Sequence, residues 1–384
     1  MKNGINNICY ISIGLLGIYI SIYQSIISTI TKEYSISNTV AGVIISMHFL
    51  GSVVAPVIFG EISDRIGKKA VVVVAFVISI TGLLFIFLFN SIVMVVIGIF
   101  MIGSGFGVAE GTLSGILSDV NAGETDRVIS ISQMFFSIGA VAGPLIALSL
   151  ISLYGSWKVL FLLLIILYCV ILVYLVRLKF VEKSDVVRYD HGLISVKLVK
   201  EKIFILLCIS IFIYVGIEEG VAFWLKTYFE STYNAGQLGV YALSGYWGSM
   251  IIGRFIASRF AKYNKQLMAG GLLVSLLFLI VVLLVKSSMI SIICFMGVGL
   301  GFSAVWPIIM STTARHYSEY TGTALGIMMT CSAAGGIAVP SLIGFIADFS
   351  MIGTAFWVIP VMVVLILAAQ MNIWVSPLFS GNQR

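Results

Sequence analysis

Apolar residues fall along the chain in long runs that are almost free of charge and are separated by short polar breaks. The runs are roughly 18 to 30 residues long, enough for a helix that rises 1.5 Å per residue to cross the ~30 Å hydrocarbon layer. A membrane β-barrel would instead show segments of about ten residues that alternate apolar and polar side chains. The runs Val71–Phe89 and Val159–Val176 do not alternate. The pattern therefore predicts an all-α protein that has lipid as its solvent.

Charges, glycines and prolines break the chain into twelve predicted membrane spans. They cover residues 8–31, 39–59, 70–89, 92–118, 129–153, 158–177, 203–229, 236–256, 267–285, 289–313, 322–346 and 353–376. The longest polar stretch, 182–202, divides the spans six and six, as expected for a duplicated six-helix unit. We expect two pseudo-symmetric six-helix bundles, 1–177 and 203–384, joined by a cytoplasmic linker at 178–202.

Composition excludes several classes of protein. Hydrophobic residues make up 60% of the chain and charged residues 10%, against about a quarter charged in soluble domains. The net charge is +6, but the Lys and Arg residues occupy gaps between spans, whereas a nucleic-acid-binding protein gathers them on one soluble face. No metal-spaced Cys or His, catalytic triad or phosphate-binding glycine loop is present, so we expect no enzyme, metal or cofactor.

The placement of basic residues predicts the orientation in the membrane. If both termini are cytoplasmic, the inside segments hold eighteen of the 22 Lys and Arg residues. The outside segments hold Lys32, Lys158, Lys226 and Lys286. Because Lys and Arg concentrate in cytoplasmic loops, we expect a multi-pass protein of the cell membrane with both termini inside. Arg254, near the end of the span 236–256, is counted with the basic residues of the cytoplasmic loop that follows, so that no basic residue is expected in the middle of a span.

The stretch Gly60–Lys69 resembles the loop signature of the major facilitator superfamily, which lies between the second and third helices. The matching residues are Gly60, Asp64, Arg65, Gly67, Lys68 and Lys69. A weaker copy at Gly253–Lys262 can be laid over Phe59–Lys68, with Ser258 in place of Asp64. The resemblance implies a conformational latch, in which Asp64 caps a helix that begins near Thr321 in the other half.

Within that superfamily the chain is similar to the fucose–galactose–glucose:proton symporter branch. The similar segments are Gly103–Glu110, Gln133–Phe135, Tyr214–Glu218, Gly253–Arg254, Gly299–Gly301 and Trp306–Pro307. The chain departs from the branch's fucose permease at Tyr23–Gln24 and at Phe136. The resemblance implies a monomeric secondary active transporter that moves a sugar by alternating access and couples it to protons.

Three acids lie well inside predicted spans, namely Glu110, Glu218 and Glu219. An ionisable group within the hydrocarbon layer is costly and is therefore a functional candidate. Glu110 and Glu218 are candidates for proton transfer or for accepting a solute hydroxyl, with a purely structural acid as the alternative. Glu219 points about 100° away from Glu218 around the helix, so the two cannot face one partner.

Other polar and aromatic residues inside spans are candidates for binding the solute. His48, Gln24 and Gln133 could exchange hydrogen bonds with hydroxyl groups, or could simply join helices. Trp224 and Trp306 could cover the C–H face of a sugar, whereas the remaining tryptophans, Trp247 among them, are interpreted as interface anchors or packing residues.

Two other functions remain open. The segment Gly139–Pro144 resembles an element of drug–proton antiporters, which favours efflux of an amphipathic compound, although glycines at this spacing also serve close helix packing. The other alternative is a transporter-like sensor that binds a solute without moving it.

Overall fold

The computed structural model describes residues 2–35, 38–177 and 198–374, which form helices joined by short turns and contain no strand. The first half comprises α1 (Lys2–Glu33), α2 (Asn38–Ile66), α3 (Lys68–Leu88), α4 (Ile92–Val120), α5 (Thr125–Tyr154) and α6 (Lys158–Arg177). The second half comprises α8 (Lys202–Tyr233), α9 (Gly236–Arg259), η1 (Ala261–Tyr263), α10 (Asn264–Leu284), α11 (Ser288–Phe302), α12 (Val305–His316), α13 (Thr321–Phe349), α14 (Ile352–Ala355) and α15 (Val358–Trp374). Each predicted span coincides with one helix or with one interrupted pair of helices, so the all-α prediction is confirmed.

Two spans are interrupted, between α11 and α12 and between α14 and α15. Pro307 and Pro360 are each the third residue of the helix that follows the break. Proline has no N–H, so neither residue can bond the carbonyl four positions earlier, which belongs to Ser303 or Phe356. The prolines therefore account for both breaks, and the first break leaves a carbonyl free for another donor.

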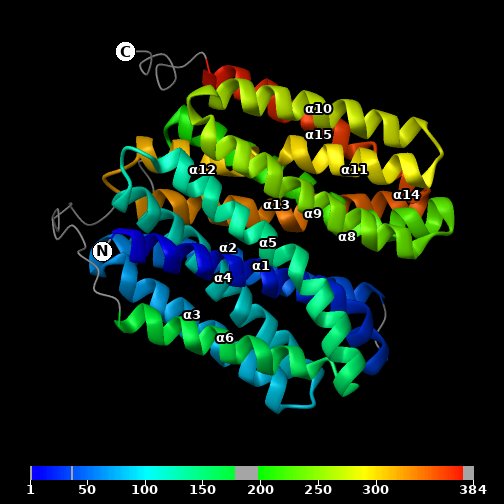
Figure 1. Ribbon diagram of the computed structural model, residues 1–384, viewed down its shortest axis with the longest axis horizontal. Helices are drawn as coiled ribbons and strands as arrows, with labels where there is room; N and C mark the ends of the chain where they lie inside the picture. The colour runs from blue at the N-terminus through cyan, green and yellow to red at the C-terminus, as the bar shows by residue number, and fades with distance from the viewer. Residues whose placement is uncertain (1, 36–37, 178–197, 375–384) are drawn as a thin grey trace.

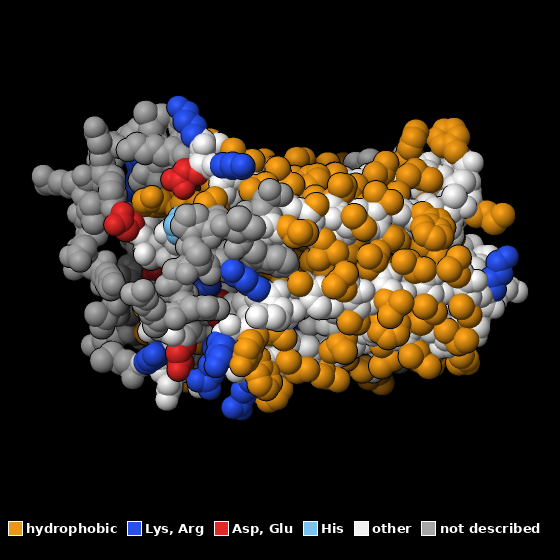
Figure 2. All heavy atoms as spheres, turned by 90° about the horizontal axis from the view of Figure 1, so that it is seen from above, with side chains coloured by type: hydrophobic (Ala, Val, Ile, Leu, Met, Phe, Trp, Pro, Cys, Tyr) orange, Lys and Arg blue, Asp and Glu red, His pale blue; other side chains and the backbone are white. Residues whose placement is uncertain are grey.

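The outer surface is that of a membrane protein. Within the described residues, ten helical segments are long and apolar enough to cross a membrane, and α2 adds a shorter apolar stretch at Ile44–Gly60. The space-filling view shows hydrophobic side chains over most of the length of the molecule and charged side chains gathered mainly at one end (Figure 2). Such a belt is the surface expected where lipid contacts protein. The chain is a multi-pass membrane protein.

The two halves lie side by side (Figure 1). Helices α1 to α6 occupy one side of the molecule and α8 to α15 the other. Both described ends of the chain, Lys2 and Trp374, lie at the same end of the molecule, which we call the termini end. The prediction that the two termini share one side of the membrane agrees with this arrangement.

Glycines bring α1 and α5 into close contact inside the first half. A Cβ atom on Gly17 would lie 2.1 Å from the carbonyl oxygen of Phe136, and one on Gly139 would lie 2.1 Å from that of Gly14. No side chain fits at either position. Close packing thus gives the Gly139–Pro144 segment a structural role that does not depend on efflux.

Backbone contact between the halves occurs where α2 meets α13. A Cβ atom on Gly326 would lie 2.4 Å from the carbonyl oxygen of Pro56, and one on Gly60 would lie 2.6 Å from that of Gly322. Helices α5 and α9 form the other extensive contact between the halves. These two contacts flank the space in which the polar residues of the spans meet.

Candidate solute site

A cavity of about 50 Å³ lies between the two halves. Its wall combines aromatic rings with three carboxyl groups and one guanidinium. The first half supplies Ile20, His48, Phe49, Ser52, Phe106, Glu110, Gln133 and Phe136 to the wall. The second half supplies Val215, Glu218, Glu219, Trp247, Arg254, Trp306, Met329, Ser332 and Ala333. Of the eight residues that the sequence suggested for solute or protons, six line this cavity.

Glu110 on α4 and Gln133 on α5 form the polar part of the first half. Both side chains are buried, and the Gln133 amide donates to Glu110 Oε1 over 3.2 Å. An amide is a neutral partner, so this contact does not require Glu110 to be ionised. The pair can therefore hold Glu110 in either protonation state.

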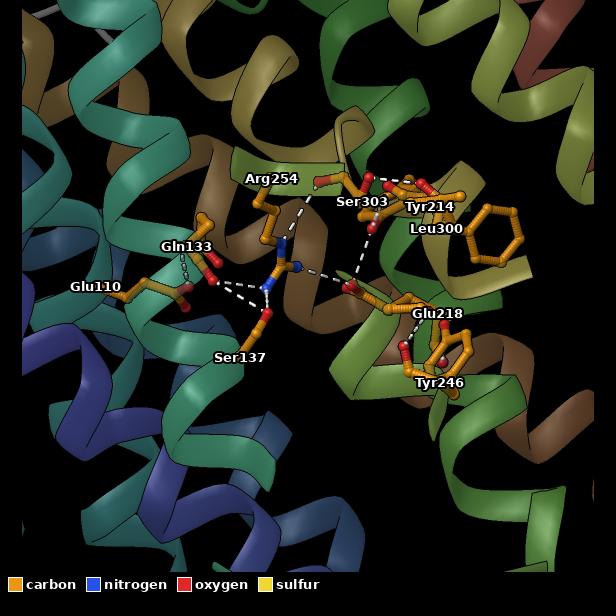
Figure 3. A network of polar contacts seen from close by, with 11 residues as sticks. Glu110, Gln133, Ser137, Tyr214, Glu218, Tyr246, Arg254, Leu300 and Ser303 are labelled. Carbon is orange, nitrogen blue, oxygen red and sulfur yellow. Dashed lines mark hydrogen bonds and ion pairs between the residues drawn. The ribbon is translucent and has the colours of Figure 1, made fainter. Parts of the chain in front are cut away.

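Arg254 on α9 joins the two halves (Figure 3). Its Nη1 donates to the backbone carbonyl of Gln133 over 2.8 Å and also to the hydroxyl of Ser137, both on α5. Its Nη2 lies 3.3 Å from Glu218 Oε1 on α8, and its Nε donates to the carbonyl of Ser303 over 3.4 Å. One guanidinium thus connects three helices and the α11–α12 break.

The expectation for Arg254 was wrong. It was counted with the cytoplasmic loop that follows the span 236–256, but it lies inside α9 and is only 1% exposed. Its proximity to Arg259 and Lys262 made it look like one member of a basic loop. The spans therefore do contain a buried cation, and that cation is paired with Glu218.

The break before α12 supplies acceptors to this network. Ser303, whose carbonyl loses its intrahelical partner because of Pro307, accepts from Arg254. The hydroxyl of Tyr214 lies 3.0 Å from the carbonyl oxygen of Phe302 and 2.8 Å from Glu218 Oε1. A tyrosine hydroxyl has one proton to donate. It can donate to an ionised Glu218, or accept from a protonated Glu218 while donating to Phe302, so both states of Glu218 have a hydrogen-bonding pattern.

Glu218 and Glu219 turn to different partners, as their spacing predicted. Glu218 faces Arg254 and Tyr214, whereas Glu219 Oε2 lies 3.4 Å from the amide nitrogen of Gln24 on α1. Gln24 itself is not part of the cavity wall but joins the two halves through Glu219. Both acids nevertheless line the same cavity.

The remaining predicted residues lie in different places. His48 lines the cavity within an aromatic cluster, and its Nδ1 lies 3.2 Å from the Tyr19 hydroxyl. Trp306 also lines the cavity. Trp224 does not line the cavity. Its indole nitrogen donates over 2.9 Å to the carbonyl of Pro340 and thereby joins α8 to α13. Trp247, interpreted from the sequence as a packing residue, does line the cavity.

The residues of the Gly60–Lys69 stretch lie at the termini end. Gly67 has a φ of 97° between α2 and α3, a conformation that glycine adopts readily. The ammonium of Lys68 pairs with Asp119 over 2.9 Å, and Lys69 donates to the carbonyl of Val176. The backbone of Arg65 lies in the last turn of α2. The side chain of Asp64, to which the capping role was assigned, lies outside those that the structure describes.

Two groups of contacts join the halves at the termini end. Thr321, at the start of α13, donates to Asp119 at the end of α4 over 3.3 Å. Asp126, in the first turn of α5, accepts from Arg315 and Ser311 on α12 and from Asn264 on α10. Asp119 in the first half thus contacts the first turn of α13, and α10 and α12 in the second half contact the first turn of α5. Asp126 lies between the predicted spans 92–118 and 129–153 and was given no role from the sequence, so this second contact was missed.

The described chain thus consists of two helical halves with a polar cavity between them. Among the described residues, no group of three or more His, Cys, Asp and Glu side chains could hold a metal ion. The family model described as Major Facilitator Superfamily matches residues 9–340. The chain belongs to this superfamily, whose members are transporters and not enzymes.

Comparison with curated relatives points to small solutes. The chain is 24% identical to a gentisate transporter of Corynebacterium glutamicum over 367 residues, covering 87% of this chain and 80% of the relative. It is 26% identical to a putative glucose/galactose transporter of Helicobacter pylori over 316 residues, covering 76% of each chain.

Solved structures show the same fold. The E. coli fucose:proton symporter FucP matches with a TM-score of 0.79 and 16% identity over 96% of this chain and 98% of its own. The human organic anion transporter MFSD10 matches with a TM-score of 0.78 and 14% identity over 96% of this chain and 99% of its own.

Proposed function

We propose that the protein carries a sugar across the cell membrane by alternating access and couples this movement to protons. The observation that carries the proposal is the composition of the cavity, in which aromatic rings surround Glu110, Glu218, Glu219 and Arg254. Aromatic rings pack against the C–H faces of a sugar, and carboxyl groups accept hydrogen bonds from its hydroxyls. The curated glucose/galactose transporters among the relatives support the same solute class.

The hydrogen bonds that Arg254 already makes favour a neutral solute over an anion. Its guanidinium already meets four acceptors, on Gln133, Ser137, Glu218 and Ser303. Little donor capacity remains for the carboxylate of a solute, which would also lie near three acids. A neutral compound with several hydroxyls avoids both costs.

The size of the cavity supports alternating access. Pockets that enclose small ligands measure about 300 Å³ or more, whereas this one measures about 50 Å³. The halves must therefore move apart to admit a sugar. We propose that 1–177 and 203–384 move as two units around this site, with the termini end facing the cytoplasm.

Proton coupling rests on the acids that have neutral partners. Glu110 contacts the amide of Gln133, and Glu219 contacts that of Gln24. Neither contact fixes the carboxyl in its ionised form, so each acid can take up a proton from one side and release it to the other.

Transport into proteoliposomes tests the proposal. We expect the purified protein to accumulate labelled glucose, galactose or fucose against a gradient when the lumen is more alkaline than the outside. Dissipating the proton gradient should abolish accumulation but leave exchange of labelled for unlabelled sugar. Vesicles that neither accumulate nor exchange any of these sugars would contradict the proposal and favour efflux or a sensor.

Uptake of an aromatic acid is the second candidate. It is favoured by the gentisate transporter among the relatives. The same vesicles, supplied with labelled gentisate, separate the two candidates. Accumulation of gentisate without accumulation of sugars would replace the first proposal.

A further inference from the structure

Trp247 on α9 has a buried polar group without a partner. Its side chain is 3% exposed and lines the cavity, and its indole nitrogen finds no acceptor among the residues that the structure describes. Tryptophan can only donate through this nitrogen, and buried indoles usually find an acceptor. An unpaired donor at a cavity wall is available to a ligand in the cavity.

Two other tryptophans, the buried Trp157 and the partly buried Trp224, have acceptors for their indole nitrogens. The indole nitrogen of Trp157 donates to Glu33, and that of Trp224 donates to the carbonyl of Pro340. Neither residue lines the cavity. Trp247 differs from both because it lines the cavity and its donor is unpaired.

The position of Trp247 brings it next to the polar network. It lies seven residues before Arg254, about two helical turns, so both side chains project from the same face of α9. Its ring also lies 6.3 Å, centroid to centroid, from that of Phe136 on α5. The indole thus forms part of the wall between the two halves.

We propose that Trp247 binds the solute directly, donating its indole N–H to a solute oxygen and covering the adjacent C–H face with its ring. This assignment rests on the proposed function and narrows the solute class. Glu110 and Glu219 offer acceptors, while Trp247 offers a donor. An ammonium group would leave the indole unpaired, and a carboxylate would face the acids. Hydroxyl groups, which both donate and accept, satisfy both sides.

Binding of glucose, galactose and fucose to detergent-solubilised full-length protein tests this assignment. Trp247→Phe keeps an aromatic ring and removes the N–H, and we expect sugar affinity to fall by about 2- to 12-fold, as for loss of one hydrogen bond. The thermal unfolding temperature should fall less than in Trp157→Phe, because both variants lose packing but the N–H of Trp247 has no protein acceptor to lose. Trp157→Phe is the matched control, which should lower the unfolding temperature and leave sugar affinity unchanged.

A panel of deoxyglucoses identifies the solute oxygen. In the wild type, removing the hydroxyl that accepts from Trp247 should weaken binding, and the same removal should have no further effect in Trp247→Phe. If the phenylalanine variant does not fold, Trp247→Tyr replaces it. Tyrosine also lacks the indole N–H, and its hydroxyl lies at a different position on the side chain.

The possible outcomes separate this inference from the proposed function. Equal sugar affinity of the wild type and the Trp247 variants, with every deoxyglucose penalty retained, would overturn the role of Trp247 while leaving sugar transport intact. If the wild type binds none of the sugars, the proposal of sugar transport is wrong. The assignment of a sugar hydroxyl as the ligand of Trp247 is then wrong as well.

Discussion

The guanidinium of Arg254 lies 3.3 Å from the carboxyl of Glu218 while it also holds the backbone of α5 in the opposite half. Arginine remains charged in proteins. Arg254 is therefore a permanent cation that bridges the two halves. A change in the charge of Glu218 changes the group with which this cation is paired. The ion pair therefore links the state of a buried acid to the contact between α5 and α9.

Arg254→Gln should destabilise the protein strongly, because it leaves Glu218 buried beside no cation. Removing one partner of a buried ion pair costs about 3–5 kcal/mol. Unfolding in mixed micelles, followed by circular dichroism, measures the loss. The double variant Arg254→Gln, Glu218→Gln should recover most of it, because no buried charge is then left without its partner. Equal stability of the single and double variants would contradict the pairing.

Glu110→Gln should uncouple transport from the proton gradient. Glutamine keeps the shape of the side chain and its contact with Gln133 but has no proton to release. We expect gradient-driven sugar accumulation to fall to the level of equilibration while sugar exchange continues. If Glu218 is the carrier, this pattern should appear in Glu218→Gln, and Glu110→Gln should only weaken binding. Full accumulation by both variants would exclude coupling through either acid.

Asp126→Asn should weaken the contact at the termini end by roughly 1–3 kcal/mol, because charged acceptors form the stronger hydrogen bonds. Its side chain accepts from Arg315, Ser311 and Asn264 of the other half. Spin labels at the exposed residues Ile66 and Phe260 should then report a larger population of long distances. Glu124→Gln is the control, since Glu124 pairs only with the exposed Arg127 on its own helix in the described structure. Identical distance distributions for the two variants would argue against the role of Asp126.

Gly326→Ala should also open the termini end. The added methyl group would lie 2.4 Å from the carbonyl oxygen of Pro56, so α13 and α2 could not keep their present approach. Gly248→Ala is the matched control, because nothing lies within 4 Å of the added carbon. We expect transport to fall in the first variant and to persist in the second. The measurement is the initial rate of sugar exchange, and equal rates would contradict the prediction.

Labelling of single cysteines tests the orientation. A cysteine at Lys2 should react with a membrane-impermeant maleimide only after intact cells are opened, because the termini end is proposed to face the cytoplasm. A cysteine at Met351, an exposed residue between α13 and α14 at the opposite end, should react in intact cells. The reverse pattern would invert the topology.

Hydropathy was sufficient to predict the helices, because the lipid solvent makes span length and charge the dominant signals. Acids inside spans were recognised by the same rule, and Glu110, Glu218 and Glu219 do meet at one cavity. The rule failed for Arg254, since a basic residue near the end of a span cannot be distinguished by composition from a loop residue. Pro307 did carry a signal for the break before α12, which a closer reading of proline positions would have used.

Partners and exact contacts could not be predicted. Whether Trp247 faces lipid or the cavity depends on the rotation of α9 about its axis, and several glycines and serines on that helix leave the apolar face poorly defined. The contact of Asp126 with Arg315 joins residues 189 positions apart, so it depends on how the two halves dock.

The two contacts at the termini end have a mechanical consequence. One lies between Asp119 and Thr321 and the other between Asp126 and Arg315, so they fasten the halves at two separate points. A single point would let the halves swivel in every direction, whereas two points define a line. If the halves move as two units while both contacts hold, their rotation would be about that line and would part them at the opposite end.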